Sequence, residues 1–453
     1  MQDETWRELA TIVDEGTPAE LTDFLEQLEY EDRAYAVARL PEEARQKLLI
    51  TIEPEEAAEI IEGLPESQVS EAFEQMPAAD AARIVEELQS HHAADVVGEL
   101  EPERAAEILD EMDVADAMEV RALAAYDDDV AGGLMLTELL EYDADLHVGD
   151  VVADLQSNAE RYEGFDVQYV YVVDSAGRLV GVLYLRDLLL TPPWRPVREI
   201  MLQEPLFVSD SADVEELRSV FDSISFNAVP VVDASQRLLG VVRRSALQER
   251  LAERSEQDYL LTQGIVGGEE LRTMPMLTRS GRRLSWLSVN IVLNFFAASV
   301  IAANEEVLQQ VIALAVFLPI LSDMSGCSGN QAVAVSMREL SLGLVEPREA
   351  LRVALKEVMV GTLNGAALGV LVGGAAWAYS GMPWLGLVVG VALMLNTMIA
   401  VVVGGTVPLM MKRFGVDPAL ASGPLLTTVT DMCGFFLVLT MASALLPRLV
   451  GAE

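Results

Sequence analysis

The distribution of charge along the chain constrains its fold more than any other feature. Residues 1–270 hold 62 Asp and Glu against 19 Lys and Arg, whereas residues 271–453 hold 10 against 11. The second part contains several apolar runs long enough to cross a bilayer, which takes about 20 residues. The sequence therefore predicts an acidic soluble part joined to a membrane domain, in a chain whose 453 residues allow about three domains.

Changes in composition predict the domain boundaries. We expect an acidic helical-repeat domain at 1–130, a duplicated α/β domain at 131–253, a linking helix at 254–282 and an all-α membrane domain of five helices at 283–453. A surface this acidic repels phosphates, which excludes nucleic acid as a partner, and it attracts cations.

A twelve-residue rhythm of prolines predicts a small helical solenoid in the first domain. Each proline precedes acidic residues, alanines and an apolar pair, and Ser90 fills the one gap; the prolines are Pro41, Pro54, Pro65, Pro77 and Pro102. Proline suits the first turn of a helix, and acidic residues there complement the helix dipole. His91 and His92 fall at one helix start, lack the spacing of metal ligands and are interpreted as structural.

An internal duplication marks the second domain. The segment Val172–Gly181 recurs 59 residues later as Val231–Gly240, each copy predicting a strand, a turn, a strand and a helix. This pattern resembles a tandem CBS pair, with copies at 131–196 and 197–253. CBS pairs often hold an adenine nucleotide through an aspartate six residues after the strand glycine. The first copy has Asp187 there and the second has Ala246, so the resemblance implies the loss of one half-site and leaves nucleotide binding at Asp187 open.

Five apolar stretches predict five membrane spans, at Leu284–Ala303, Val307 to about Ser325, Val353–Ala378, Trp384–Met411 and Pro418–Leu446. Arginine and lysine cluster before the first span, between the second and third, and between the fourth and fifth. With five spans, all of these clusters lie on one side of the membrane, which is the cytoplasmic side by the positive-inside rule. We therefore expect a multi-pass protein of the cell membrane with its N-terminus in the cytoplasm and its C-terminus outside.

One carboxylate interrupts the last span. Asp431 lies within an otherwise uncharged apolar segment, where a charge costs roughly 2.5–3.5 kcal/mol to insert. Such a residue is a functional-site hypothesis by default, with a cation as its partner. The run Leu318–Gln331 combines a proline, two glycines and several polar side chains. We expect irregular backbone there lining a water-filled path, with Asp323 as a second ion site or a helix-end acid; the plainer alternative is a kink and a cytoplasmic helix end.

Glycines at every fourth position mark the third span: Gly361, Gly365, Gly369 and Gly373. This spacing puts all four on one face and predicts close helix packing.

The whole chain resembles the MgtE-type magnesium transporter family. The stretches that carry the resemblance are Arg283–Asn290, the run from Pro319 to Gln331, and Asp417–Gly434. The family implies no enzyme but a homodimeric, channel-like Mg²⁺ pathway through the lipid bilayer, closed when its cytosolic domains bind Mg²⁺. By the motif match, Asp431 is the pore carboxylate, paired with its copy in the second subunit. Gly329 and Asn330 line the same path, and the linking helix couples sensor to pore.

Three alternatives stay open. Cys327 stands where the family usually has asparagine, and because thiols favour softer metals, Co²⁺, Zn²⁺ or Ni²⁺ are possible ions. Asp323 and Asp431 could instead form an intramembrane aspartyl protease pair, although the motif around Asp431 differs from that of such enzymes. The third alternative is a cation sensor that conducts nothing.

Two groups of carboxylates are candidates for a regulatory Mg²⁺ sensor. The first lies at the start of a CBS helix and comprises Asp210, Asp213, Glu215 and Glu216. The second lies on the linking helix and comprises Glu256 and Asp258.

Overall fold

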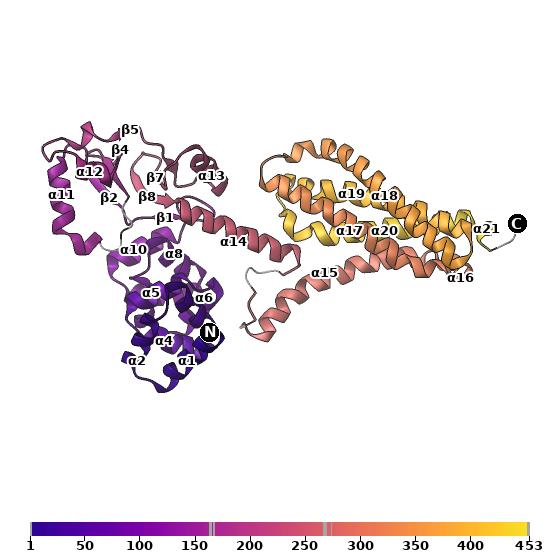
Figure 1. Cartoon of the computed structure of the whole chain (residues 1–453), viewed down its shortest axis with the longest axis horizontal. Coiled ribbons are helices and arrows are strands. Elements are labelled where there is room, and N and C mark those ends of the chain that lie inside the picture. Colours follow the sequence, from indigo (N-terminus) through magenta and orange to yellow (C-terminus); the bar gives the residue numbers. More distant parts are fainter. Residues whose placement is uncertain (1, 163–164, 166–167, 266–269, 273, 451–453) are drawn as a thin grey trace. The chain divides into compact units, whose positions relative to one another are not determined.

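The structure is a computed structural model that describes residues 2–162, 165, 168–265, 270–272 and 274–450. Contacts divide it into two compact units, Met1–Glu253 and Arg254–Glu453, and each is described by itself (Figure 1). Some predicted segments lie outside the described residues, namely 163–164 and 166–167 of the duplicated domain, 266–269 and 273 of the linking helix, and 451–453 of the membrane domain.

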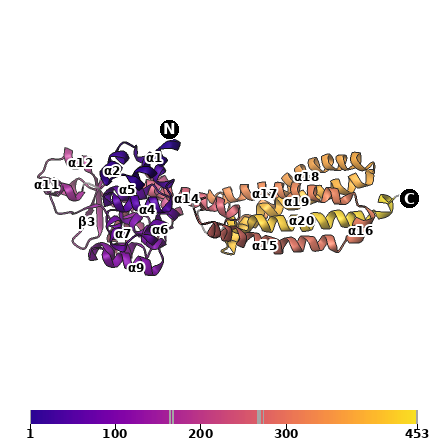
Figure 2. The same cartoon turned by 90° about the horizontal axis from the view of Figure 1, so that it is seen from below.

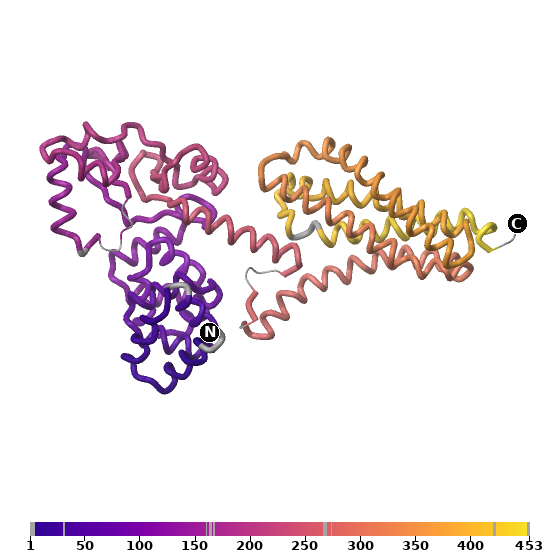
Figure 3. Tube along the Cα trace, viewed as in Figure 1, coloured from indigo at the N-terminus to yellow at the C-terminus, as the bar shows by residue number. Residues whose placement is uncertain are grey.

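The first domain is a stack of short helices, as the proline rhythm predicts. Odd-numbered helices contact one another in one row from α1 to α9, and even-numbered helices from α4 to α10 form a second row. Figure 3 follows the chain through this stack, from indigo to purple. The helices are α1 (Gln2–Glu15), α2 (Pro18–Glu26), α3 (Tyr30–Ala38), α4 (Glu42–Thr51), α5 (Pro54–Glu62), α6 (Glu66–Gln75), α7 (Ala78–Val85), α8 (Ser90–Glu99), α9 (Pro102–Glu111) and α10 (Val114–Leu123).

The prolines set the helix starts of this domain. Pro54 and Pro102 occupy the first turn of α5 and α9, where a missing N–H costs nothing. Pro41, Pro65 and Pro77 each directly precede a helix. The apolar pairs of the repeat, such as those at 60–61, 84–85 and 108–109, are buried in one continuous core.

The second domain contains two four-stranded sheets, with strand orders β1-β8-β7-β6 and β2-β3-β4-β5. In each sheet one pair is parallel, β6 with β7 and β2 with β3, and the other pairs are antiparallel. The strands are β1 (Met135–Leu136), β2 (Leu140–Asp143), β3 (Tyr169–Val173), β4 (Leu179–Tyr184), β5 (Leu202–Gln203), β6 (Val208–Ser209), β7 (Ala228–Val232) and β8 (Leu238–Arg243). The helices are α11 (Val148–Ser157), η1 (Ala159–Tyr162), α12 (Leu185–Leu190), η2 (Val197–Glu199), α13 (Val214–Ser223) and α14 (Arg244–Thr262).

The two copies use the same turn. Asp174 accepts hydrogen bonds from the backbone N–H of Ala176 and of Arg178, at 2.9 and 3.0 Å. Asp233, 59 residues later, accepts the equivalent bonds from Ser235 and Arg237, at 2.7 and 2.9 Å. The internal duplication is therefore present in the structure down to single hydrogen bonds.

The linking helix differs from its prediction at 254–282. Helix α14 ends at Thr262, and α15 begins only at Met276. Gly264 follows with φ +79°, a left-handed conformation that ends a helix readily when the residue is glycine. Pro275, directly before α15, suits a helix start. The predicted single helix is therefore two helices separated by a linker.

The second unit is built around five long helices, which run lengthwise side by side in both views (Figures 1 and 2). They are α15 (Met276–Ala302), α17 (Leu314–Ser341), α18 (Ala350–Ser380), α19 (Pro383–Arg413) and α20 (Pro418–Ala444), with short helices α16 (Glu305–Gln310), η3 (Pro347–Glu349) and α21 (Leu446–Leu449). Among the described residues, four segments are apolar and long enough to cross a membrane: Met276–Ala302, Pro347–Ser380, Pro383–Arg413 and Gly423–Ala444. Helix α17 has similar length but carries more polar residues.

The second predicted span is shifted and is not broken where we expected. Its first residues form the separate helix α16, and the chain departs from helical geometry at Val311, with φ −130° and ψ 68°. From Leu314 onward, α17 continues through Pro319 and both glycines to Ser341. Pro319 lies only in the second turn, so it removes a single hydrogen bond near the helix start, where the loss is smallest. The prediction of irregular backbone at 318–331 was wrong.

The glycine stripe of α18 packs as predicted. Gly361, Gly365, Gly369 and Gly373 are buried against α19. A methyl group added at Gly365 or Gly369 would lie 2.5 Å from a backbone oxygen of α19. Only glycine allows the two helices to approach so closely.

Candidate functional site

Asp431 on α20 is buried inside the membrane bundle, with 8% of its surface exposed. The hydroxyl of Ser322 on α17 donates a hydrogen bond to Asp431 Oδ1. The neighbouring Thr430 is fully buried, and its hydroxyl donates to the carbonyl of Thr427 at 2.9 Å. A carboxylate is therefore held between two helices and bound by a neutral donor, a setting in which a cation would complete its environment.

A second polar layer lies behind Ser322. Ser325, one turn further along α17, donates to the carbonyl of Leu321 at 2.6 Å and lies 3.1 Å from that of Ser322. Asn396 on α19 donates from Nδ2 to Ser325 Oγ at 2.6 Å. Ser325, Asn396 and Thr397 are fully buried. Sequence reasoning missed Asn396 and Thr397, and the signal available was a polar pair in the most apolar span.

The protein also presents a polar face on α17. Asp323, Cys327 and Asn330 are all exposed, at spacings of four and three that place them on one side of the helix. Cys327 Sγ lies 4.0 Å from Asp323 Oδ1. The alternative of a protease pair is not supported, because the hydrogen-bond partner of Asp431 is Ser322 and Asp323 belongs to the exposed face.

Gly329 lies on the opposite side of α17 and is buried. A methyl group there would lie 2.8 Å from Leu426 on α20 and 3.0 Å from the carbonyl oxygen of Ala400 on α19. The structure therefore brings Asp431 together with Ser322, places Asp323 and Asn330 on the exposed face, and uses Gly329 to pack three helices.

Basic residues gather at one end of the bundle. Helices α17 and α19 end there with Arg338 and with Lys412 and Arg413, and α15 and α18 begin there (Figure 1). At the other end, Arg448 of α21 lies over the ring of Trp384 at the start of α19, 4.5 Å from its centre.

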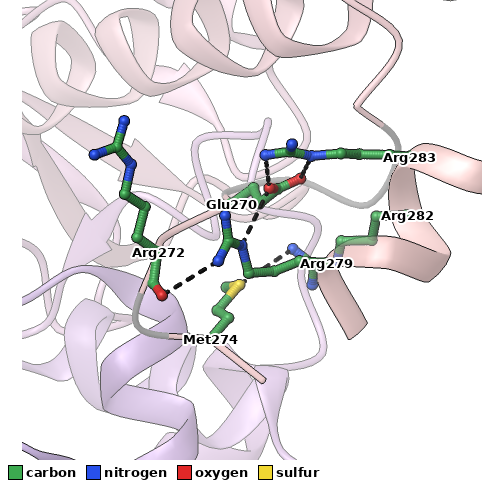
Figure 4. A network of polar contacts seen from close by, with 6 residues as sticks. All are labelled: Glu270, Arg272, Met274, Arg279, Arg282 and Arg283. Atoms are coloured by element: carbon green, nitrogen blue, oxygen red, sulfur yellow. Dashed lines mark hydrogen bonds and ion pairs between the residues drawn. The ribbon is translucent and has the colours of Figure 1, made fainter. Parts of the chain in front are cut away.

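A network of ion pairs ties the linker to the start of α15 (Figure 4). Glu270, whose side chain is 2% exposed, pairs with Arg283 and with Arg279, the latter at 3.4 Å. Arg279 also donates to the carbonyl of Arg272 at 3.4 Å. The hydrogen bond from Arg283, with that from Arg279, lowers the pKa of Glu270. The linker is thus held to α15 by one carboxylate between two guanidinium groups.

Two of the six predicted sensor residues make local hydrogen bonds. Asp213 caps α13 by accepting from the N–H of Glu216 at 2.8 Å, and Asp210 accepts from the hydroxyl of Tyr126 at 3.2 Å. Glu215, Glu216 and Glu256 are exposed, and Asp258 is half-buried. In the part of the chain that the structure describes, no three His, Cys, Asp or Glu side chains converge as a metal site.

Acidic residues do approach one another where the helical domain meets the CBS pair. Asp95 on α8 is an exposed residue by surface area. Desolvation by the surrounding chain, followed by repulsion from Asp128 and Glu253, nevertheless raises the pKa of its carboxyl to about 7. Arg250 on α14 lies among these acids, 3.0 Å from Asp129 and 3.4 Å from Glu253. No local sequence pattern indicates this junction, because its members come from three separate segments of the chain.

Asp187, the candidate nucleotide residue, lies in the first turn of α12. Its carboxylate pairs with the adjacent Arg186 at 3.3 Å.

Comparison with known proteins assigns the class. The chain belongs to the MgtE family of divalent cation transporters, because a curated member is 37% identical over 72% of both chains. The family model of that description matches residues 318–441, the part that contains Asp431. The MgtE intracellular N domain matches 5–64 and 48–129, and the CBS domain matches 129–191 and 197–253. It is accordingly a membrane protein.

Particular relatives are the magnesium transporters MgtE of Thermus thermophilus and Bacillus subtilis. The first is 37% identical over 335 residues, 72% of each chain, and the second is 30% identical over 336 residues, 74% of each chain. A crystal structure of the soluble part of a magnesium transporter is 25% identical, with a TM-score of 0.51, and its whole length matches 56% of this chain.

Proposed function

We propose that the protein conducts Mg²⁺ across the cell membrane as a homodimer, with Asp431 as the carboxylate that binds the ion in the path. The observation that carries the proposal is the buried Asp431 in a membrane domain, bonded to the neutral hydroxyl of Ser322. Curated relatives that span 72–74% of the chain are named as magnesium transporters.

We propose that Asp431 binds Mg²⁺ while the ion keeps its water molecules. Mg²⁺ loses its waters reluctantly and is usually held by one or two carboxylates through waters that it keeps. Two symmetry-related Asp431 residues could hold such an ion without dehydrating it. This binding is firm enough to admit the ion and weak enough to release it.

A second subunit would complete the polar face of α17. Exposed Asp323, Cys327 and Asn330 would be costly against lipid, so they are expected to face protein or water. Pairing two copies along this face would enclose a polar path in which Asp323 is a second ion site and Asn330 a lining residue. Cross-linking through Cys327 in membranes tests the pairing; a chain that stays monomeric in lipid contradicts it.

Flux in liposomes tests the pore carboxylate. Full-length protein should carry Mg²⁺ into vesicles, and Asp431→Asn should abolish that flux while the variant elutes like the wild type in size exclusion. Glu306→Gln removes an exposed carboxylate from α16 and is the control, expected to retain full flux. Wild-type flux in Asp431→Asn would rule out the assigned role.

Ion choice is tested at Cys327. Softer ions such as Co²⁺, Zn²⁺ or Ni²⁺ are the alternative cargo, because thiols favour them. We expect Mg²⁺ to carry the larger flux in the wild type, and Cys327→Asn to lower Co²⁺ and Zn²⁺ flux more than Mg²⁺ flux. A wild-type protein that carries Zn²⁺ but no Mg²⁺ would favour the alternative.

We further propose that cytosolic Mg²⁺ closes the pathway by neutralising the acids between α8 and α14. The raised pKa of Asp95 reflects, after desolvation, repulsion from Asp128 and Glu253, which a divalent cation would relieve. Asp210, Asp213, Glu215, Glu216, Glu256 and Asp258 are further carboxylates that could contribute. The N-terminus is then cytoplasmic, on the side of the basic helix ends, and the C-terminus outside. If the CBS pair holds a nucleotide, Asp187 is the residue expected to contact it.

Scattering tests the sensor. Small-angle scattering of the full-length protein in detergent should give a smaller radius with Mg²⁺ than without it. Asp95→Asn should weaken the Mg²⁺ dependence, whereas Glu111→Gln, an exposed carboxylate of α9, should not. A radius unchanged by Mg²⁺ in the wild type contradicts the sensor and leaves the role of Asp431 untouched.

A further inference from the structure

The polar layer behind Asp431 has a defined direction of hydrogen bonding. The single hydroxyl hydrogen of Ser325 goes to the carbonyl of Leu321 at 2.6 Å, so its oxygen is left to accept from Asn396 Nδ2 at 2.6 Å. That assignment turns Asn396 Oδ1 away, and Oδ1 has no hydrogen-bond partner within the described residues. The side-chain amide of Asn396 therefore makes its hydrogen bond to Ser325, while its Oδ1 atom is left unsatisfied.

Ser322 lies next to this hydrogen-bonded group. Ser325 lies 3.1 Å from the carbonyl of Ser322 and is itself held by Asn396. A methyl group at Gly434 of α20 would lie 2.5 Å from Asn396 Nδ2, so α20 holds the amide in place on its other side. The side chain of Ser325, which lies beside the carbonyl of Ser322, is therefore positioned by groups from α17, α19 and α20.

The hydroxyl of Ser322 determines what Asp431 can offer an ion. It has one hydrogen, and that hydrogen is donated to Asp431 Oδ1. One of the two lone pairs of Oδ1 is thereby engaged by the protein, so Oδ2 is the freer oxygen. Such a carboxylate is suited to accept from the water of a hydrated ion and poorly suited to chelate a bare one through both oxygens.

We propose that Ser322 is a specificity-determining residue that favours Mg²⁺ over Ca²⁺ at Asp431, with Asn396 and Ser325 as its positioning residues. Ca²⁺ sheds water easily and takes carboxylates in bidentate fashion, whereas Mg²⁺ keeps its waters and binds through one oxygen. Occupying Oδ1 with a hydroxyl therefore penalises Ca²⁺ selectively. The inference rests on the proposed function of Asp431 as the ion-binding carboxylate and adds the basis of ion choice.

Paired flux measurements test the inference. The full-length protein is reconstituted in liposomes that contain an indicator, and Mg²⁺ and Ca²⁺ fluxes are measured on the same preparation. Ser322→Ala frees Oδ1 and should raise the ratio of Ca²⁺ flux to Mg²⁺ flux by about tenfold, the factor expected when a hydrogen bond to a charged group is removed. Ser322→Thr retains the hydroxyl and should keep the wild-type ratio. Asn396→Ala should shift the ratio in the same direction as Ser322→Ala, by less.

Ser336→Ala is the matched control. Its hydroxyl also lies on α17 but donates to the carbonyl of Gly405 at 2.8 Å, away from Asp431, so its loss should leave the ratio unchanged. If Ser322→Ala does not fold, Ser322→Cys replaces it, because a thiol is a weak donor of similar size and should also raise the ratio. An unchanged ratio in a conducting Ser322→Ala or Ser322→Cys overturns the inference. A wild type that carries no divalent ion would instead overturn the proposed function.

Discussion

Gly329 on α17 and Gly404 on α19 meet backbone to backbone: a methyl group added at Gly404 would lie 2.2 Å from the carbonyl oxygen of Gly329. This contact explains why position 329 is glycine although it lies in a regular helix, whereas a methyl group at Gly326 would meet nothing within 4 Å. The small residue brings α17 against α19 and so sets the depth at which Ser322 faces Asp431.

Gly404→Ala should therefore destabilise the membrane domain. Overpacking a close helix contact typically costs about 1–3 kcal/mol, and no flexible side chain is available to move aside, because the obstructing atoms are backbone. Gly374→Ala on α18 is the control, since nothing lies within 4 Å of a methyl group there. Thermal unfolding of the detergent-solubilised protein should show a lower midpoint for Gly404→Ala alone; equal midpoints would contradict the packing role.

Gly434→Ala should act through Asn396. The added methyl group would lie 2.5 Å from Asn396 Nδ2, which must move and lose its bond to Ser325. In the Asn396→Ala background that obstacle is gone, so Gly434→Ala should cost less there. A double-mutant cycle on unfolding midpoints measures the coupling, and strictly additive effects would show that the two residues do not interact.

Acid should weaken the first unit, Met1–Glu253, through His91. Burial, then His92 and Arg243, lowers the pKa of His91 from 6.5 to about 3. Between these values the unfolded chain binds the proton and the folded chain does not, so stability is present above pH 6.5 and is lost as the pH falls towards 3. At pH 5 the loss from this group is about 2 kcal/mol relative to pH 8.

Replacing the imidazole of His91 separates its contribution to the pH dependence of stability from the contributions of other titratable groups. The stability of His91→Gln, measured by hydrogen exchange of α8 amides, should fall less between pH 8 and pH 5 than that of the wild type. Identical pH dependence in the two proteins would mean that His91 does not titrate in this range.

Glu270→Gln should loosen the linker before α15. The substitution removes the charge that pairs with Arg279 and Arg283 while keeping the shape of the side chain. Amide hydrogen exchange around Arg272 and Met274 should rise in the variant and stay at the wild-type level in Glu306→Gln. Because the ion pairs lower the pKa of Glu270, acidification below its ordinary value of 4.5 should reproduce the effect in the wild type.

Local signals in the sequence predict much of this fold. Prolines fix helix starts in the solenoid, the repeat of Val172–Gly181 predicts the two-sheet domain, and one charge in an apolar run singles out Asp431. These features need only neighbouring residues to be interpreted. The family resemblance adds that Asp431 occupies the position of the pore carboxylate in the family motif.

What the sequence did not predict depends on contacts between distant segments. Glycine and proline in 318–331 are compatible with a broken helix or a packed one, and only the approach of Gly404 decides between them. The partners of Asp431 are similarly hidden, because Ser322 lies 109 residues away from it. The acids around Asp95 come from separate helices, so their repulsion is invisible along the chain.

The glycine stripe of α18 has a mechanical consequence. Gly361, Gly365, Gly369 and Gly373 bring the backbone of α18 close to that of α19 over the middle of both helices. Interfaces packed this closely do not slide gradually. We therefore expect α18 and α19 to move together as one rigid body. Because α17 also meets α19 backbone to backbone at Gly329 and Gly404, any rearrangement within the bundle should come mainly from α20. Such a shift of α20 would change the distance between Asp431 and Ser322.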